Sequence, residues 1–348
     1  MDHGRVRFGA QFVAAQRQRF GSKPPEQRPL AYDIAVGEEY QEWRAWLDAQ
    51  LALLPDREAD RIAGQLWQED KRFWPSVFEL AVGAGLRAAG LDVAYERSWD
   101  GLTPDWTVFD IAGKPLCFVE VHTDQPPDAT YGLLRSWRGL EERIAQIPCP
   151  VVLTLAADPD LSGPIPPPDA RTAKRIARDL KNALLRLNPQ IRISTCGYTF
   201  VVLADRWGRQ LPSPRGLRAH FMAPSGGAGV VSAWQLVERV GEKIAKYREL
   251  AATYEVPLVV AVGAHRFTGV GLEELDDLLA GRQTITFQFN AGDPFIGEQT
   301  VQLDRPRHWR MPPELSGLLW ISNQFPFALT ARPNPTAQRP MPHALLNP

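Results

Sequence analysis

The sequence has few cysteines and no long apolar run. Cys117, Cys149 and Cys196 are the only cysteines, and none belongs to a Cys-x-x-Cys pair, which argues against a disulfide framework and against a zinc cluster. No stretch approaches the roughly 18 apolar residues of a transmembrane helix. Residues 1–30 are polar and arginine-rich, unlike a secretory signal. We therefore expect a cytoplasmic protein that has no membrane partner.

An excess of charge of either sign is also missing. Lys and Arg total 39, Asp and Glu total 40, and the net charge is −1. No global field therefore attracts this protein to nucleic acid or to a membrane, and any such binding must come from local patches. The contents of 44% hydrophobic and 23% charged residues are ordinary for a globular protein and exclude disorder of the whole chain.

Strands that alternate with helices predict an α/β fold. Residues 1–35 carry six Arg and Lys residues and are interpreted as a loosely ordered basic arm. Residues 36–157 are expected to hold N-terminal helices and a core, residues 169–331 an α/β extension, and residues 332–348 a proline-rich tail. Helices are predicted from residue 39 onward and over 58–68, 73–89, 131–147, 169–187 and 232–252. Strands are predicted over 93–97, 106–111, 116–123, 151–156, 199–204, 257–263, 284–290, 317–322 and 327–331.

One acidic residue stands out in the helix predicted over 73–89. Glu79 is the only charged residue between Phe73 and Leu86. A carboxylate on an otherwise apolar helix loses hydration and needs a partner. It belongs either to a functional site or to a structural pair with a buried arginine or a neighbouring backbone group.

Two more carboxylates converge on a predicted hairpin. Alternation along the strand at 116–123 puts Glu120 and His122 on one face. The turn before this strand allows two registers, one with Asp105 opposite Glu120 and one with Asp105 opposite His122. Either register brings Asp105 within side-chain reach of Glu120. Two such carboxylates repel each other unless a cation lies between them, and oxygen ligands suit Mg²⁺.

The order of these residues resembles the motif of the PD-(D/E)XK nuclease superfamily. It consists of Glu79 on a helix, then Pro104-Asp105, then Glu120-Val121-His122. That superfamily folds as helix, three antiparallel strands, helix, strand, and elements of these types are predicted in this order over residues 73–156. The resemblance implies a restriction-endonuclease-like core.

The resemblance also implies roles for individual residues. Asp105 and Glu120 would hold Mg²⁺ or Mn²⁺ together with the main-chain carbonyl of Val121, and Glu79 would be the extra helix acid of many members. In that superfamily the position after Val121 normally carries a lysine that orients or deprotonates the attacking water. In this chain the residue there is His122. An imidazole could accept that proton near neutral pH, or His122 could mark an inactive site. Both alternatives stay open.

A second resemblance lies near the C-terminal end. Residues 242–247 read Glu-Lys-Ile-Ala-Lys-Tyr and lead into an apolar strand, which looks like a group of uncharacterised bacterial nuclease-like proteins, as does the segment 334–342. No activity carries over from that group. The alternative for the helix at 232–252 is simple core packing.

A concentrated positive face is predicted on the helix at 169–187. Its basic residues recur at helical spacing opposite an apolar stripe and are Arg171, Lys174, Arg175, Arg178 and Lys181. Such a face suits a phosphate backbone, and the alternative is a solvated surface. Basic residues at 206–220 and a basic-aromatic cluster at 305–310 extend the positive character.

These features predict a metal-dependent nuclease that acts on DNA or RNA, with bacterial defence or DNA processing as candidate settings. The first alternative is a catalytically inactive nuclease-fold module that binds nucleic acid or serves as a scaffold. The second is an α/β protein with an unrelated small-molecule pocket. The sequence leaves open the choice between DNA and RNA, and whether the chain forms a homo-oligomer.

Overall fold

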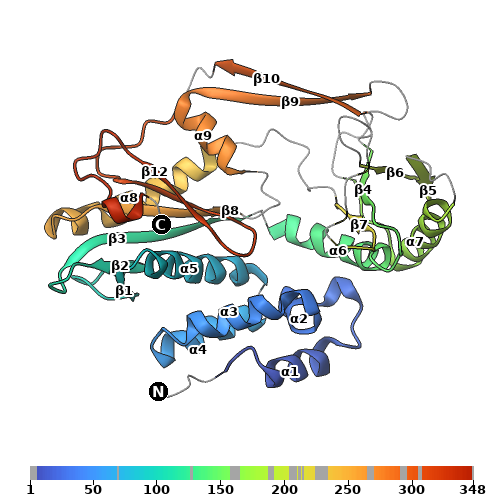
Figure 1. Ribbon diagram of the computed structural model, residues 1–348, viewed down its shortest axis with the longest axis horizontal. Helices are drawn as coiled ribbons and strands as arrows, with labels where there is room; N and C mark the ends of the chain where they lie inside the picture. The colour runs from blue at the N-terminus through green and yellow to red at the C-terminus, as the bar shows by residue number, and fades with distance from the viewer. Residues whose placement is uncertain are drawn as a thin grey trace.

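A computed structural model describes residues 6–68, 70–125, 128–156, 165–186, 192–203, 210, 213, 215–223, 234–264, 270–290, 296–304 and 308–346. The fold is α/β, with one six-stranded sheet, one four-stranded sheet and a two-stranded ribbon in this part of the chain (Figure 1). None of the described helices is both long and apolar enough to cross a membrane.

The N-terminal third is helical. It comprises α1 (Ala10–Phe20), η1 (Pro25–Gln27), α2 (Leu30–Val36), η2 (Glu38–Tyr40), α3 (Gln41–Leu51), α4 (Asp56–Gln68) and α5 (Asp70–Ala88). The basic arm predicted for residues 1–35 is therefore wrong from residue 6 onward. Phe12 of α1 and Ile34 of α2 are fully buried in the same core as α5. They are buried because each is an apolar residue on the inner side of its short helix.

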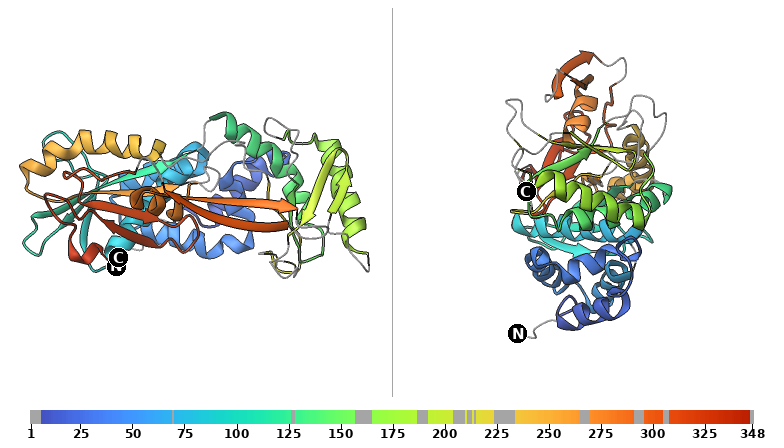
Figure 2. Two further views of the ribbon diagram at one scale, coloured as in Figure 1. Left: turned by 90° about the horizontal axis from the view of Figure 1, so that it is seen from above. Right: turned by 90° about the vertical axis from the view of Figure 1, so that its right-hand side faces the viewer.

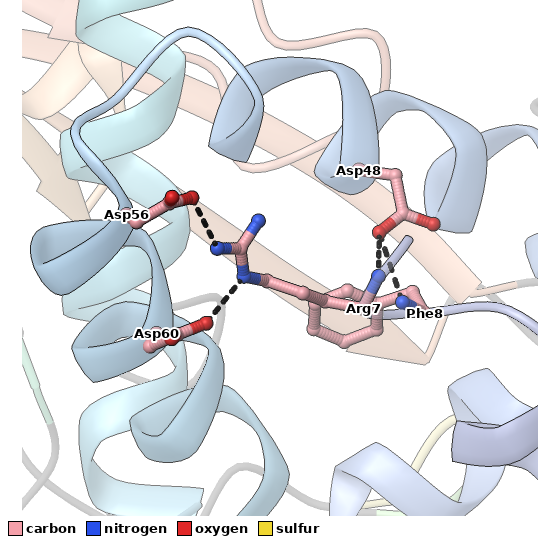
Figure 3. Close-up of polar contacts among 5 residues, drawn as sticks. All are labelled: Arg7, Phe8, Asp48, Asp56 and Asp60. Carbon is pink, nitrogen blue, oxygen red and sulfur yellow. Dashed lines mark hydrogen bonds and ion pairs between the residues drawn. The ribbon is translucent and has the colours of Figure 1, made fainter. Parts of the chain in front are cut away.

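Arg7 shows why the count of basic residues misled the prediction. Its guanidinium lies between Asp60 and Asp56 of α4, with N–O distances of 2.8 and 3.3 Å. Its main-chain N–H and that of Phe8 donate to Asp48 of α3 at 2.6 and 2.9 Å (Figure 3). The Arg7 side chain is only 5% exposed, so its charge is balanced by carboxylates of the same chain and is not offered to an external partner.

The six-stranded sheet has the order β1-β2-β3-β8-β11-β12. Its strands are β1 (Asp92–Tyr95), β2 (Trp106–Phe109), β3 (Pro115–Asp124), β8 (Leu258–Ala264), β11 (Gly317–Ile321) and β12 (Leu329–Pro333). The first three form an antiparallel meander, β8 runs parallel to β3, β11 runs parallel to β8, and β12 returns antiparallel. The sheet is therefore mixed, with its parallel strands at the centre.

Helices cover both faces of this sheet. On one face, Val77 and Phe78 of α5 share a core with Val259 and Ala261 of β8. On the other face, α8 (Trp234–Thr253) and α9 (Leu272–Ala280) share a core with the alternate residues of β8. A strand buried on both faces must be apolar throughout, and every residue of β8 is buried.

The strand beside β3 differs from the predicted one. The segment expected over 151–156 is β4 (Val152–Leu155), which lies in the four-stranded sheet of order β5-β6-β4-β7. The helix expected over 131–147 is α6 (Asp128–Ile144), and it packs in that second sheet's core. The prediction failed because both 151–156 and 257–263 are apolar, and order along the chain does not say which one pairs with β3. Only the second is apolar enough to be buried on both sides.

The described elements within residues 128–223 form a unit inserted between β3 and α8, which we call the inserted unit. It also contains α7 (Ala170–Leu184), β5 (Arg192–Thr195), β6 (Tyr198–Val202) and β7 (His220–Phe221). Its core includes Trp137, Leu140, Ile176 and Phe200. The inserted unit lies at one end of the molecule (Figures 1 and 2). The domain boundary predicted between residues 157 and 169 falls within it.

The remaining elements are the ribbon of β9 (Arg282–Asn290) and β10 (Ile296–Asp304), and η3 (His343–Leu345). The predicted strand at 284–290 is confirmed as part of β9, and its partner β10 was not predicted. The proline-rich tail predicted over 332–348 contributes Met341 and Leu345 to the main core. It is therefore packed against the protein through those two residues.

Candidate carboxylate and lysine site

The hairpin of β2 and β3 brings Asp105 and Glu120 together. Trp106 pairs with Val119, and this register continues to place Asp105 opposite Glu120. The Asp105 N–H donates to Glu120 Oε1 at 3.2 Å, and the Val121 N–H donates to Asp105 Oδ2 at 2.7 Å. The first of the two predicted registers is thus the observed one. The group of Val121 that contacts Asp105 is its N–H, and the predicted role of its carbonyl as a metal ligand stays a prediction.

A lysine that was not predicted as a site residue completes this group. Glu120 lies on the face of β3 that also carries Phe118, and Phe118 shares a buried core with Tyr247 of α8. One turn earlier on α8, Lys243 Nζ donates to Glu120 Oε2 at 2.8 Å. Glu120 is 1% exposed and Lys243 is 29% exposed. The lysine was visible in the segment 242–247, but its place beside Glu120 follows only once β8 is known to adjoin β3.

Tyr247 fixes the position of α8 over the hairpin. Its hydroxyl donates to the main-chain oxygen of Thr103 at 2.8 Å, two residues before Asp105. The Tyr247 side chain is 1% exposed. This bond ties the lysine-bearing helix to the loop that delivers the first carboxylate, so the two halves of the site are held in register.

Glu79 approaches from α5, on the other face of the sheet. Its Oε2 accepts a hydrogen bond from the Tyr95 hydroxyl at 2.5 Å. Its main-chain oxygen accepts one from Trp106 Nε1 at 2.9 Å. Arg61 in turn donates to the Tyr95 hydroxyl at 3.1 Å and pairs with Glu96 at 2.6 Å. The partner that a carboxylate on an apolar helix requires is therefore a tyrosine, itself held by an arginine.

The three carboxyl groups affect one another. Burial, and then the charge of Asp105, raise the pKa of Glu79 to about 7. Burial and Asp105 also raise the pKa of Glu120 to about 7, although Lys243 opposes the shift. The pKa of Asp105 is raised by burial, which outweighs the opposing effects of Lys243 and of the Val121 N–H. Burial is the largest cause of each of these shifts, so the site disfavours charged carboxylates, and a bound cation would favour the charged form.

Lys243 is charged at neutral pH. Burial lowers the pKa of Lys243, but the carboxylates of Glu120 and Asp105 raise it by more, so that the net shift is upward. An ammonium held beside a carboxylate pair can stabilise anionic oxygen that enters the site.

His122 lies on the same face of β3 as Glu120. Its Nε2 is buried and has no hydrogen-bond partner among the described residues. Burial, followed by the charges of Lys243 and Arg239, lowers the pKa of His122 to about 4. The imidazole is therefore neutral at physiological pH. Its predicted role as the proton acceptor stays a prediction, and Lys243 is now the cationic group beside Glu120.

The fit of a divalent cation rests on the chemistry of the oxygen donors. In the described part of the chain, no group of three or more His, Cys, Asp or Glu side chains is arranged to hold a metal ion. Asp105 and Glu120 do supply the hard oxygen donors that Mg²⁺ prefers, in a site whose carboxyl pKa values are raised. The donor set fits Mg²⁺ or Mn²⁺ at these two residues, provided that Glu120 exchanges its contact with Lys243.

The predicted basic face is exposed but lies elsewhere. Ile176, Leu180 and Leu184 are buried along one side of α7, while the exposed side carries Arg171, Lys174, Arg175, Arg178 and Lys181. Because α7 belongs to the inserted unit, the structure does not bring this face together with Asp105 and Glu120 (Figures 1 and 2). Leu187, the last residue of the helix predicted over 169–187, lies outside the described residues, as do Arg206, Arg209, Arg305 and Arg307 of the predicted basic extensions.

Comparisons of the chain with protein-family models, with curated proteins and with solved structures found no match.

Proposed function

We propose that this protein hydrolyses phosphodiester bonds of DNA or RNA with the help of a divalent metal ion. The observation that carries the proposal is the convergence of Asp105, Glu120 and Lys243 from three separate elements. Two carboxylates and an ammonium are the groups that the PD-(D/E)XK resemblance requires. The ammonium would come from α8 instead of the position after Val121.

The topology also supports a restriction-endonuclease-like core. The helix α5, the antiparallel strands β1, β2 and β3, the helix α8 and the parallel strand β8 follow one another in the required order along the chain. The inserted unit interrupts this order between β3 and α8 without changing it. The second helix and fourth strand of such a core would then be α8 and β8, and no longer the segments first assigned to them.

Each residue of the site has a chemical role in this proposal. Asp105 and Glu120 would hold Mg²⁺ or Mn²⁺, which when bound polarises a phosphate and lowers the pKa of a water. Lys243 would stabilise the anionic oxygens of the phosphate as charge builds up there. Tyr95 keeps the Glu79 carboxyl oriented. From the α5 side, this carboxyl would position the attacking water.

A second candidate function is an inactive nuclease-fold module that only binds nucleic acid. The observation that favours it is the bonding of Glu120. Its Oε1 accepts from the Asp105 N–H and its Oε2 from Lys243, so an ammonium already neutralises the carboxylate. The exposed basic face of α7 would serve either function, as a contact with the phosphate backbone.

The test is cleavage of supercoiled plasmid and of total RNA by the purified protein with Mg²⁺ or Mn²⁺. We expect cleavage that EDTA abolishes and that Glu120→Gln reduces by at least about 10²-fold, the scale of a lost catalytic group. Glu249→Gln, a change of an exposed carboxylate on α8, is the matched control and should cleave like the wild type. Binding of both nucleic acids without cleavage by either metal would favour the inactive module.

The α7 face has its own test. Replacing Arg171, Lys174, Arg175 and Arg178 with alanine should weaken binding of nucleic acid and flatten its dependence on salt. The reason is that a protein with fewer phosphate contacts releases fewer counterions when it binds. Unchanged binding at low salt would make α7 a solvated surface.

A further inference from the structure

Two more cations flank Lys243 on α8. Arg239, Lys243 and Lys246 are spaced by four and then three residues, which places them on one side of a helix. The Arg239 side chain is 61% exposed, Lys246 is also exposed, and Lys243 lies between them at the edge of the buried face. We call these three residues the α8 row.

The α8 row lies along the carboxylates. Its central member bonds to Glu120 at 2.8 Å, and the Tyr247 bond to Thr103 holds the helix over the hairpin. Arg239 lies one helical turn before Lys243, and Lys246 lies about one turn after it. The outer cations thus lie on either side of the group formed by Asp105, Glu120 and Lys243.

We propose that the α8 row contacts consecutive phosphates of one nucleic-acid strand, so that the strand runs along α8 and passes over Asp105 and Glu120. This inference rests on the proposed function and adds to it the path of the substrate. Seven residues of helix rise about 10 Å, and three consecutive phosphates of one strand, which are two steps apart, span roughly 7 Å along the duplex axis. The row is therefore long enough to contact a short stretch of backbone centred on the carboxylates.

Glu242 is an acidic neighbour of the row on α8. It pairs with Arg239 at 3.0 Å, and the two side chains are 61% and 64% exposed. An exposed pair of this kind contributes little to stability and is screened by salt. A phosphate can therefore replace Glu242 as the partner of Arg239. The Lys246 ammonium lies 4.5 Å from the centre of the Tyr247 ring, so its contact is with α8 itself, the helix that carries the site.

The experiment measures binding without cleavage. Fluorescence anisotropy of a labelled DNA duplex, and of RNA of the same sequence, is recorded in EDTA across a salt series. The double variant Arg239→Ala/Lys246→Ala should bind at least about tenfold more weakly near 0.1 M salt. The slope of log K against log salt should fall by about 0.9 for each lost phosphate contact on duplex DNA.

The matched control is Arg248→Ala. Arg248 is also exposed on α8, but its spacing places it on a different side of the helix from the row. It should bind with wild-type affinity and slope, and thermal unfolding confirms that each variant is folded. If the double variant binds like the wild type, or if the wild type binds neither probe, the α8 row is not a phosphate contact. If the double variant binds more weakly but the wild type never cleaves nucleic acid, the nuclease proposal is overturned and the α8 row still stands as a phosphate contact.

Discussion

Lys243 of α8 donates a hydrogen bond to the buried carboxylate of Glu120 on β3 at 2.8 Å, across 123 residues of sequence. Removing one partner of a buried ion pair leaves the other charge uncompensated, which costs about 3–5 kcal/mol when the pair is fully buried. Because Lys243 is 29% exposed, we expect Lys243→Met to lower the free energy of unfolding by about 1–3 kcal/mol, measured by urea denaturation at pH 8. Lys246→Met, on the exposed side of the same helix, should change it by less than about 0.5 kcal/mol.

A double-mutant cycle separates the pair from its surroundings. In Glu120→Gln the carboxylate is gone, so adding Lys243→Met should cost less than it does in the wild type. Equal costs in the two backgrounds would mean that the bond contributes nothing to stability.

The pH dependence of stability reports the raised pKa of Glu79. This group titrates near 4.5 in the unfolded chain and near 7 in the folded protein. Between these values the folded state binds more protons, so stability falls as pH rises from about 4.5 to about 7 and the loss is complete above that range. The loss amounts to at most about 3 kcal/mol.

Glu79→Gln keeps an oxygen acceptor for Tyr95 and removes the titration. We expect the unfolding free energy of the wild type, relative to this variant, to decline between pH 4.5 and pH 7 in a series of urea denaturations. A relative stability that rises with pH would show that the carboxyl prefers its charged form, contrary to its burial.

Gly83 of α5 tests the packing beneath the site. A Cβ at this position would lie 2.2 Å from Cζ2 of Trp106, the ring whose Nε1 bonds to the main chain of Glu79. Gly83→Ala should destabilise the protein by about 1–3 kcal/mol, as overpacked cores do.

Gly64 of α4 is the control, because a Cβ there meets nothing within 4 Å. Gly64→Ala should be neutral or stabilise the protein by up to about 1 kcal/mol. Both values come from thermal or urea unfolding. Equal effects of the two substitutions would contradict the tight contact between α5 and Trp106.

The identity of the group that replaces the expected lysine can be decided kinetically. Lys243 carries the charge beside Glu120, whereas burial keeps His122 neutral with a pKa of about 4. We therefore expect Lys243→Ala to reduce the cleavage rate by about 10²–10⁴-fold, the usual scale for a positioned polar catalyst, and His122→Ala to reduce it by much less.

Lys243→Arg is a useful companion, since it keeps the charge but changes its geometry. Because Glu79 and Glu120 titrate near pH 7, the role of His122 is measured as a difference, and the pH profile of His122→Ala should coincide with that of the wild type. A larger loss for His122→Ala than for Lys243→Ala would assign the proton transfer to the histidine.

Local features of the site could be predicted from the sequence, and distant ones could not. Asp105 and Glu120 belong to one hairpin, so alternation and a short turn were enough to bring them together. Lys243 depends on which strand lies beside β3. That choice is made by burial on both faces of β8, which a short apolar segment does not reveal on its own.

The same limit explains the N-terminal helices. The arginines between residues 5 and 28 suggested an exposed arm, but charge along the sequence does not say whether a side chain is buried. Arg7 is buried because Asp48, Asp56 and Asp60 from two later helices surround it (Figure 3). Such a charge balance is a property of the tertiary structure and appears only when the helices are placed.

The inserted unit also delays completion of the site during synthesis of the chain. A ribosome adds about 5–20 residues per second, so the 123 positions from Glu120 to Lys243 take roughly 6–25 seconds. For most of that interval the nascent chain carries both hairpin carboxylates but neither α8 nor β8, the strand that pairs with β3. The inserted unit can fold around its own core in that time, whereas the site gains its ammonium only when α8 has been synthesised.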